Sequence, residues 1–210
     1  MDQATNPSTI FRAPVHRHID RSFIDQLVNI DQSASLIDYV NRFKTEDTVI
    51  FADVDELEVH AIIDYHKAGS TKHGLVEHRA VLCLAHSHEW VTWSTISGRM
   101  YDQKSFERII DINSDDISAP AAAVLRAAAG SAPAEIALLP FVTLAIPVFT
   151  GEPTIEVKAI VDSRPGSAGN ISIGIELVRT RIVIESEIVR IAHKIASATS
   201  VPVILGSIRD

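Results

Sequence analysis

The sequence contains one cysteine, Cys83, among 210 residues, and this scarcity excludes a fold held together by disulfide bonds. A chain without disulfides fits a reducing compartment. Cys83 also lies inside an apolar segment, and a free cysteine in such a segment is usually a small buried side chain. We therefore expect an intracellular protein with Cys83 in its core.

Long hydrophobic runs are also missing. The longest weakly charged stretch, residues 119–151, is interrupted by four prolines and contains Arg126 and Glu135. Such a stretch suits neither a membrane-spanning helix nor a signal peptide. We expect a soluble, cytoplasmic protein that has no membrane as a partner.

Clusters of basic residues are absent as well. The formal net charge is -8, and the Lys and Arg residues are dispersed along the chain. Binding to a nucleic-acid backbone needs several cationic contacts in one place. The composition therefore disfavours nucleic acid as a partner, although a local basic patch is compatible with it.

The common enzyme motifs are not found. The sequence has no GxSxG, GxGxxG or GxxxxGK[ST], the motifs of serine hydrolases, dinucleotide-binding folds and P-loop proteins. Residues 164–170 contain glycine, but they join two expected strands instead of leading into a helix. That arrangement predicts a hairpin rather than a phosphate-binding loop.

What the chain does contain is enough apolar material for a core, with 46% hydrophobic and 22% charged residues. Residues 74–93 are the centre of the pattern. A polar entry leads into the apolar segment Ala80–Leu84, and a helix-like run with both tryptophans, Trp90 and Trp93, follows. A strand feeding a helix that packs back on the sheet is the simplest interpretation.

The remaining patterns predict the following elements. Before residue 84 we expect helices at 22–28 and 33–43, a hairpin of strands 48–52 and 57–66, and strand 79–84 returning antiparallel to complete a meander. After it we expect helices at 86–96, 103–112 (capped by Asp102) and 120–129, a proline-interrupted strand at 136–148, strands 154–161 and 171–184, helix 185–198 and strand 201–205.

This layout predicts an α+β fold with two antiparallel β-meanders, each followed by helices packed on one face. The expected division is an N-terminal lobe at 1–113, an alanine- and proline-rich connection at 114–140, and a C-terminal lobe at 141–210. One continuous domain is the alternative.

Several of these segments resemble one family. The segments are VIFADVDELEVHAIIDYH with EHRAVLCL, SGRMYDQKSFERII, IPVFTG, ELVRTRIVIESEIVRIAHKI and VPVILG. Together they are similar to the YfdQ-like proteins of bacteriophages and prophages, whose function is unassigned; residues 117–141 depart by being shorter and richer in alanine. The resemblance implies a phage or prophage origin and a location in the cytoplasm of a bacterial host. It supplies no catalytic residues to transfer.

The strand at 57–66 carries the most chemistry. Its alternation predicts one packed face and one polar face with His60, Asp64 and His66. Imidazole and carboxylate donors are ligands for zinc or another divalent metal. However, His60 and Asp64 are about 13 Å apart along a regular strand, so an exposed or partner-covered polar face is the competing interpretation. The acidic group Asp53, Asp55 and Glu56 lacks the features of a calcium loop and predicts a solvated turn.

Two pairs of residues are candidates for binding. His78 or Arg79 lies near the polar row, depending on strand register. Arg179 and Arg181 fall on one face of the expected strand 171–184, where an arginine pair can hold phosphate or carboxylate. Salt bridges to Glu176, Glu185 and Glu187 are the structural alternative.

Two functions follow from these features. The first is a non-catalytic accessory protein that binds a host or phage factor and self-associates through sheet faces or edges, without a cofactor. The second is a metal-dependent hydrolase that uses His60, Asp64 and His66. The sequence leans towards the first and does not identify a substrate.

Overall fold

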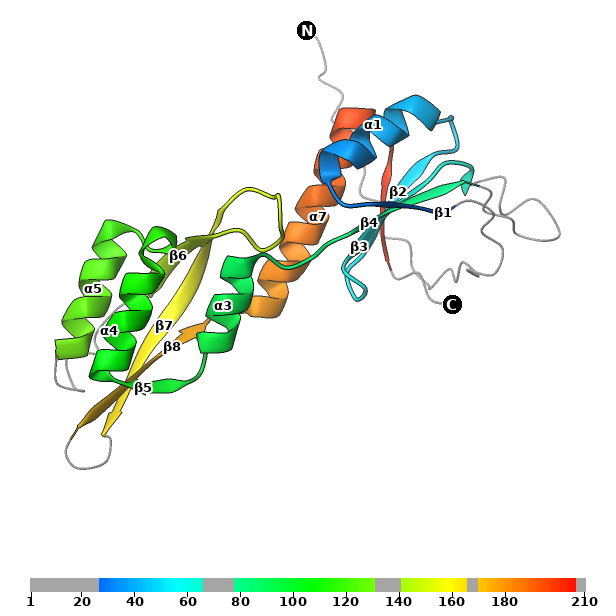
Figure 1. Ribbon diagram of the computed structural model, residues 1–210. Coiled ribbons are helices and arrows are strands. Elements are labelled where there is room, and N and C mark those ends of the chain that lie inside the picture. Colours follow the sequence, from blue (N-terminus) through cyan, green and yellow to red (C-terminus); the bar gives the residue numbers. More distant parts are fainter. Residues whose placement is uncertain (1–26, 66–77, 131–140, 166–169, 207–210) are drawn as a thin grey trace, which may run out of the picture. The chain divides into compact units, whose positions relative to one another are not determined.

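The computed structural model describes residues 27–65, 78–130, 141–165 and 170–206. The chain divides into two compact units. Unit 1 contains the described residues up to Leu84 and from Glu185 onward, and unit 2 contains Ala85–Ile184. Each unit has its own β-sheet with helices (Figure 1). The predicted α+β fold class is therefore confirmed.

Unit 1 is built on a five-stranded sheet of order β1-β4-β3-β2-β9. Its elements are β1 (Leu27–Ile30), α1 (Ser33–Phe43), β2 (Val49–Asp53), β3 (Glu58–Ile62), β4 (Arg79–Cys83) and β9 (Val203–Gly206), together with most of α7 (Thr180–Thr199). The predicted antiparallel meander β2–β3–β4 is confirmed. The two outer strands are parallel to their neighbours, β1 to β4 and β9 to β2, so the sheet is mixed. Residues 27–28, expected at the end of a helix, lie in β1.

Both faces of the central strand of this sheet are buried. Val59 and Ala61 on one face are fully buried, and so are His60 and Ile62 on the other. The predicted solvent-exposed polar face of this strand is therefore wrong. The physical reason is that His60 shares its face with the apolar residues Val49, Phe51 and Ile62. Tyr65 and Ile204 pack against these residues, so this face is covered rather than solvated.

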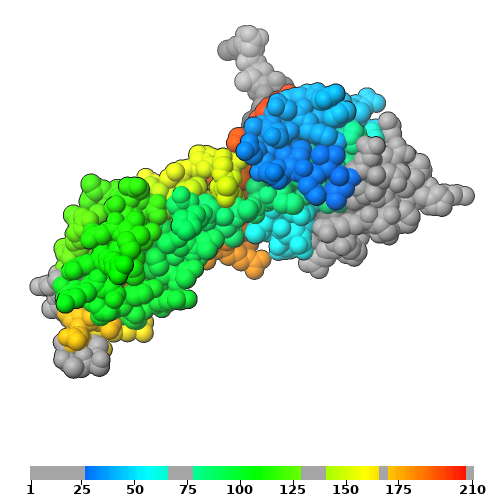
Figure 2. Space-filling model, in the orientation of Figure 1, coloured from blue at the N-terminus to red at the C-terminus, as the bar shows by residue number. Residues whose placement is uncertain are grey.

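Unit 2 is built on a four-stranded antiparallel sheet of order β5-β8-β7-β6. Its elements are α3 (His88–Ile96), β5 (Met100–Asp102), α4 (Gln103–Ile112), the short 3₁₀ helix η2 (Ser114–Asp116), α5 (Ala119–Gly130), β6 (Val142–Ile146), β7 (Ile155–Pro165) and β8 (Ile171–Leu177). The helices α3, α4 and α5 contact the strands of this sheet (Figure 1). Figure 2 views unit 2 from this helical side, where the green residues of α3–α5 cover much of the surface.

Strand β7 shows why this sheet has one open face. Val157, Ala159 and Val161 are buried, and the residues between them point the other way and are exposed, as period-2 alternation requires. The predicted arrangement of one packed and one solvated face therefore holds for this sheet. It fails for the sheet of unit 1.

The helix boundaries follow local capping signals. The predicted cap of α4 is confirmed, since the Asp102 carboxylate accepts a hydrogen bond from the Ser105 backbone N–H at 3.0 Å. The start of α3 is capped in the same way by Ser87, whose hydroxyl accepts from the Trp90 N–H. Gly98 follows α3 with φ +74°, a conformation that glycine adopts without strain.

One predicted strand is partly helix. Strand β8 ends at Leu177, and α7 begins at Thr180, so the expected strand 171–184 is too long. The β-branched residues of this segment favour a strand locally, but tertiary packing overrides that preference. Neither α7 nor any other helix in the described residues is long and apolar enough to cross a membrane.

The compact units differ from the expected division at residues 113 and 141. Strand β9 pairs with β2, and the C-terminal segment therefore belongs to unit 1. Helices α4 and α5 contact each other and the strands of unit 2, so residues on both sides of 113 belong to the same unit. Pairing between distant segments sets these boundaries, and no local composition change marks them.

Candidate functional site

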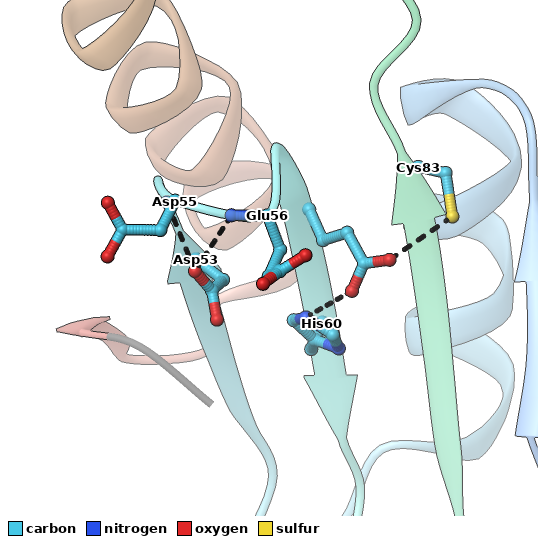
Figure 3. Close-up of polar contacts among 6 residues, drawn as sticks. Asp53, Asp55, Glu56, His60 and Cys83 are labelled. Atoms are coloured by element: carbon cyan, nitrogen blue, oxygen red, sulfur yellow. Dashed lines mark hydrogen bonds and ion pairs between the residues drawn. The ribbon is translucent and has the colours of Figure 1, made fainter. Parts of the chain in front are cut away.

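Adjacent strands of unit 1 place charged and imidazole side chains on one face of its sheet (Figure 3). In the strand register, Glu58 lies between Asp53 and Cys83, and Arg79 lies beside Ile62, two positions beyond His60 on β3. Residues paired across antiparallel strands share a face. We call Asp53, Glu58, His60 and Arg79 the polar cluster. His60 is 0% exposed and Arg79 is 2% exposed, which is rare for such side chains.

The His60 imidazole is paired with a carboxylate. Its Nε2 lies 3.0 Å from Glu58 Oε2. Burial lowers the pKa of His60 below the ordinary value of 6.5, with a smaller lowering from the positive charge of Arg79, while Glu58 and Asp53 oppose this change. His60 is therefore a neutral side chain near pH 7.

This geometry predicts a pH dependence of stability. Because the pKa of His60 is lower in the folded chain than in the unfolded chain, the unfolded chain takes up the proton first as the pH falls below 6.5. The free energy of unfolding should then decrease until His60 is protonated in the folded chain too, by at most about 1.4 kcal/mol per pH unit for one proton. Urea unfolding at pH 7.5 and at lower pH values measures this slope.

The His60→Gln variant should lose this part of the slope. His88→Gln is the matched control, because His88 is exposed at the start of α3. Equal slopes in the wild type and the His60→Gln variant would contradict the assignment.

The acidic group at the β2–β3 turn is structural. Asp53 is fully buried, and its Oδ1 accepts hydrogen bonds from the backbone N–H groups of Asp55 and Glu56 at 3.2 Å each (Figure 3). The turn also contains Leu57 with φ +57°. The predicted turn is confirmed, but Asp53 is not one of its solvated residues, since its side chain satisfies the turn's own backbone donors.

Cys83 is exposed, and its predicted burial is wrong. It is the last residue of β4. Its side chain lies on the same sheet face as the polar cluster, and the thiol donates to Glu58 Oε1 at 3.6 Å (Figure 3). A reactive cysteine needs a positive neighbour that favours the thiolate. The carboxylate of Glu58 has the opposite charge, so this contact does not make Cys83 a nucleophile.

The proposed metal ligands are not assembled within the described residues. His60 contacts Glu58 inside the sheet, whereas Asp64 is half-buried in the turn after β3. His66 lies outside the described residues. No group of three His, Cys, Asp or Glu side chains in the described ranges could hold a metal ion.

His78 and Arg79 do not act as a pair. As neighbours entering a strand, they point to opposite faces of the sheet. His78 packs against α1, where its ring lies 5.6 Å from the Tyr39 ring and 5.2 Å from the Phe43 ring, and the Tyr39 hydroxyl is hydrogen-bonded to its Nε2. Burial raises the pKa of Tyr39, which keeps that hydroxyl protonated. Arg79 belongs to the polar cluster.

Arg179 and Arg181 do not share a strand face, contrary to the prediction. Arg179 lies between β8 and α7 with φ +56°, and Arg181 lies in the first turn of α7. Both side chains are exposed. The two arginines lie in unit 2, whereas His78 and Arg79 lie in unit 1.

The sequence interpretation missed the outer row of β7. This row consists of the outward-facing side chains Glu156, Lys158, Ile160, Asp162 and Arg164. Ile160 is 45% exposed, an unusual setting for a β-branched apolar side chain in the middle of a strand. The alternation of residues 155–161 could have revealed this row, since it separates Val157, Ala159 and Val161 from charged neighbours.

The geometry defines a two-unit α+β protein with a buried polar cluster in one sheet and an open face on the other. Residues 19–138 match the family model described as an uncharacterised conserved protein (DUF2303), which covers more than half of the chain. The chain belongs to this family. No curated protein and no solved structure matches it. The matched segment ends before β6, so the outer row lies beyond it.

Proposed function

We propose that this chain is an accessory protein of a phage or prophage that acts by binding. In this proposal it works without catalysis, in the cytoplasm of a bacterial host, as a homo-oligomer that engages a host or phage protein. The phage origin is supported by the resemblance to the YfdQ-like proteins. Membership of the uncharacterised family is compatible with it.

The observation that carries the binding proposal is the open face of the sheet in unit 2. The outer row of β7 lies on this face, and Phe141 of the neighbouring chain segment, 56% exposed, extends it. Two exposed apolar side chains on one sheet face can form the apolar centre of an interaction surface, with the charged side chains around them as its polar rim. The net charge of -8 favours a protein partner over nucleic acid.

The metal-dependent hydrolase has less support. Its central residue, His60, is fully buried and lies against Glu58, so it has no access to a substrate in this arrangement. We therefore base the proposed function on the open face rather than on the polar cluster.

The Ile160→Asp variant tests the binding proposal. A carboxylate at the centre of the open face should weaken both self-association and partner binding, because charge is depleted from interface centres. Ile112→Asp is the matched control, since Ile112 is 70% exposed at the end of α4 rather than on the open face.

The measurements are sedimentation velocity over a concentration series and pull-down from bacterial lysate with quantitative mass spectrometry. The expected result is a partner and a self-associated species that persist in Ile112→Asp and are depleted at least tenfold in Ile160→Asp. If both variants behave like the wild type, the open face is not the binding surface. If the wild type neither self-associates nor retains a partner, the binding function fails.

A further inference from the structure

The charges along the outer row of β7 are arranged so that two copies of the row, placed antiparallel, bring opposite charges together. From one end to the other, the row carries a negative, a positive, an apolar, a negative and a positive side chain, namely Glu156, Lys158, Ile160, Asp162 and Arg164. In the opposite direction, from Arg164 to Glu156, each position has the opposite charge to that at the same position in the forward direction. Ile160 is the centre of this pattern and remains opposite itself.

Consider a two-fold axis that lies in the plane of the face and crosses β7 at Ile160. About this axis, every charged side chain of the row faces a side chain of opposite charge. Such an axis places a second copy face to face with its β7 antiparallel, which is the isologous arrangement of C2 dimers. Ile160 then faces its own copy, Lys158 faces Asp162 of the other copy, and Glu156 faces Arg164. Each ionic contact occurs twice, once on each side of the axis.

The neighbouring strands add an apolar contact near the same axis. The register pairs Val142 with Ala159, and continuing it by one residue brings Phe141 next to Ile160. Lys158 Nζ lies 5.8 Å from the centre of the Phe141 ring. A cation above an aromatic ring is favourable, so Lys158 is already held beside the axis. On the other side, β8 places Glu176 beside Ile160, where it would face its own copy with like charge.

A one-signed face would select an oppositely charged partner, but this face carries both signs. Within one chain, Arg164 Nε donates to Asp162 Oδ2 at 2.9 Å, and the two side chains are 69% and 46% exposed, respectively. The pair can therefore accept further contacts from Lys158 and Glu156 of a second copy. Aligned sheets pack at about 30° to each other, and this rotation displaces the inner Lys158–Asp162 contacts less than the outer ones.

We propose that the open face of unit 2 binds a second copy of this chain through antiparallel, charge-complementary packing of β7 about Ile160. This inference rests on the proposed function, whose oligomer it assigns to a surface. The four strands cover on the order of 400 Å², which is less than the ~800 Å² per partner of a standard stable interface. The dimer is therefore weak and concentration-dependent.

Charge reversal at the inner contact tests the arrangement. In Lys158→Glu, two acidic residues face each other at both contacts, and in Asp162→Lys, two lysines do. Each variant alone should be monomeric at concentrations where the wild type dimerises, with dimer affinity reduced at least tenfold. An equimolar mixture should form a heterodimer. In that heterodimer the introduced carboxylate of one variant faces the introduced ammonium group of the other, and the second contact keeps the original Lys158–Asp162 pair.

The double variant Lys158→Glu/Asp162→Lys should dimerise with itself like the wild type, since both partners of each contact are exchanged. Glu176→Gln should tighten the dimer, because it removes the like charge near the axis. Sedimentation velocity on single variants, mixture and double variant gives the result, and circular dichroism confirms that each variant is folded.

The outcomes separate this inference from the proposed function. Monomeric single variants whose mixture remains monomeric overturn the antiparallel arrangement. A wild-type oligomer that neither single variant weakens places self-association on another surface and leaves the binding function intact. A wild type that is monomeric throughout the concentration series overturns both the inference and the oligomer, while the pull-down still tests partner binding.

Discussion

The Arg79→Ala variant is expected to lose about 3–5 kcal/mol of unfolding free energy, the usual effect of removing one member of a buried charged group. Arg79 is 2% exposed and lies on the same sheet face as Asp53 and Glu58. Truncating this buried side chain leaves a cavity and removes the positive charge that acts on His60. The pKa of His60 should rise in the same variant, because Arg79 contributes to lowering it.

The matched control is Arg126→Ala. Arg126 also forms an ion pair, 2.9 Å from Asp111 Oδ1, but both side chains are more than half exposed. Exposed pairs contribute roughly 0–1 kcal/mol. Urea unfolding followed by far-UV circular dichroism measures both variants. A similar small loss in the two variants would show that burial of Arg79 adds nothing to its effect.

The same measurement tests whether the two units unfold together. Both tryptophans of the chain lie in unit 2, so tryptophan fluorescence follows that unit, whereas Arg79 lies in unit 1. Each unit buries its own apolar residues, and we expect the Arg79→Ala substitution to move the circular dichroism midpoint more than the fluorescence midpoint. Equal movement of both would indicate one cooperative unit.

The Trp93→Ala variant should show the second large effect, a loss of about 3–5 kcal/mol, because deleting a fully buried aromatic side chain removes apolar burial and leaves a cavity. Trp93 is 0% exposed in α3, and its Nε1 donates to Asp116 Oδ2 at 2.7 Å. Burial raises the pKa of Asp116, and this hydrogen bond opposes the rise. The indole therefore connects α3 with the short helix η2.

The Trp93→Phe variant separates packing from hydrogen bonding. It keeps a six-membered aromatic ring and removes the N–H donor together with the rest of the indole, so we expect a smaller loss of about 1–3 kcal/mol. Val91→Ala on the same helix is the control, because Val91 is 50% exposed. Fluorescence of the remaining Trp90 reports the transition. If Trp93→Ala is as stable as Val91→Ala, α3 does not anchor the core of unit 2.

Much of the local structure could be predicted from the sequence. The β2–β3–β4 meander follows from its apolar alternation and turn residues, and α4 follows from Asp102 and a regular apolar stripe. These signals are short-range, because capping and periodicity involve residues within one element. The prediction for the segment after Leu177 was wrong because it used only these short-range signals. Its β-branched residues favour a strand, but long-range packing makes it the start of α7.

The candidate site was less predictable. His60 was expected on an exposed face, and Cys83 in the core, and the structure has the opposite in each case. Strand alternation tells which residues share a face, but the side chains that pack over that face decide whether it is covered. Ile204 of β9 is one of the residues packed against the face of His60. The order β1-β4-β3-β2-β9 depends on β9, which follows β3 by more than a hundred residues in sequence.

The sequence by itself determined the α+β class, the lack of a disulfide framework, and which side chains of β7 share a face, because composition and period-2 alternation are properties of the local chain. Only the tertiary structure decided that β3 is central and buries His60 with Arg79, and that β7 keeps an open face. Burial depends on which distant strands and helices cover a surface, and the residues close to it in the sequence do not specify those elements.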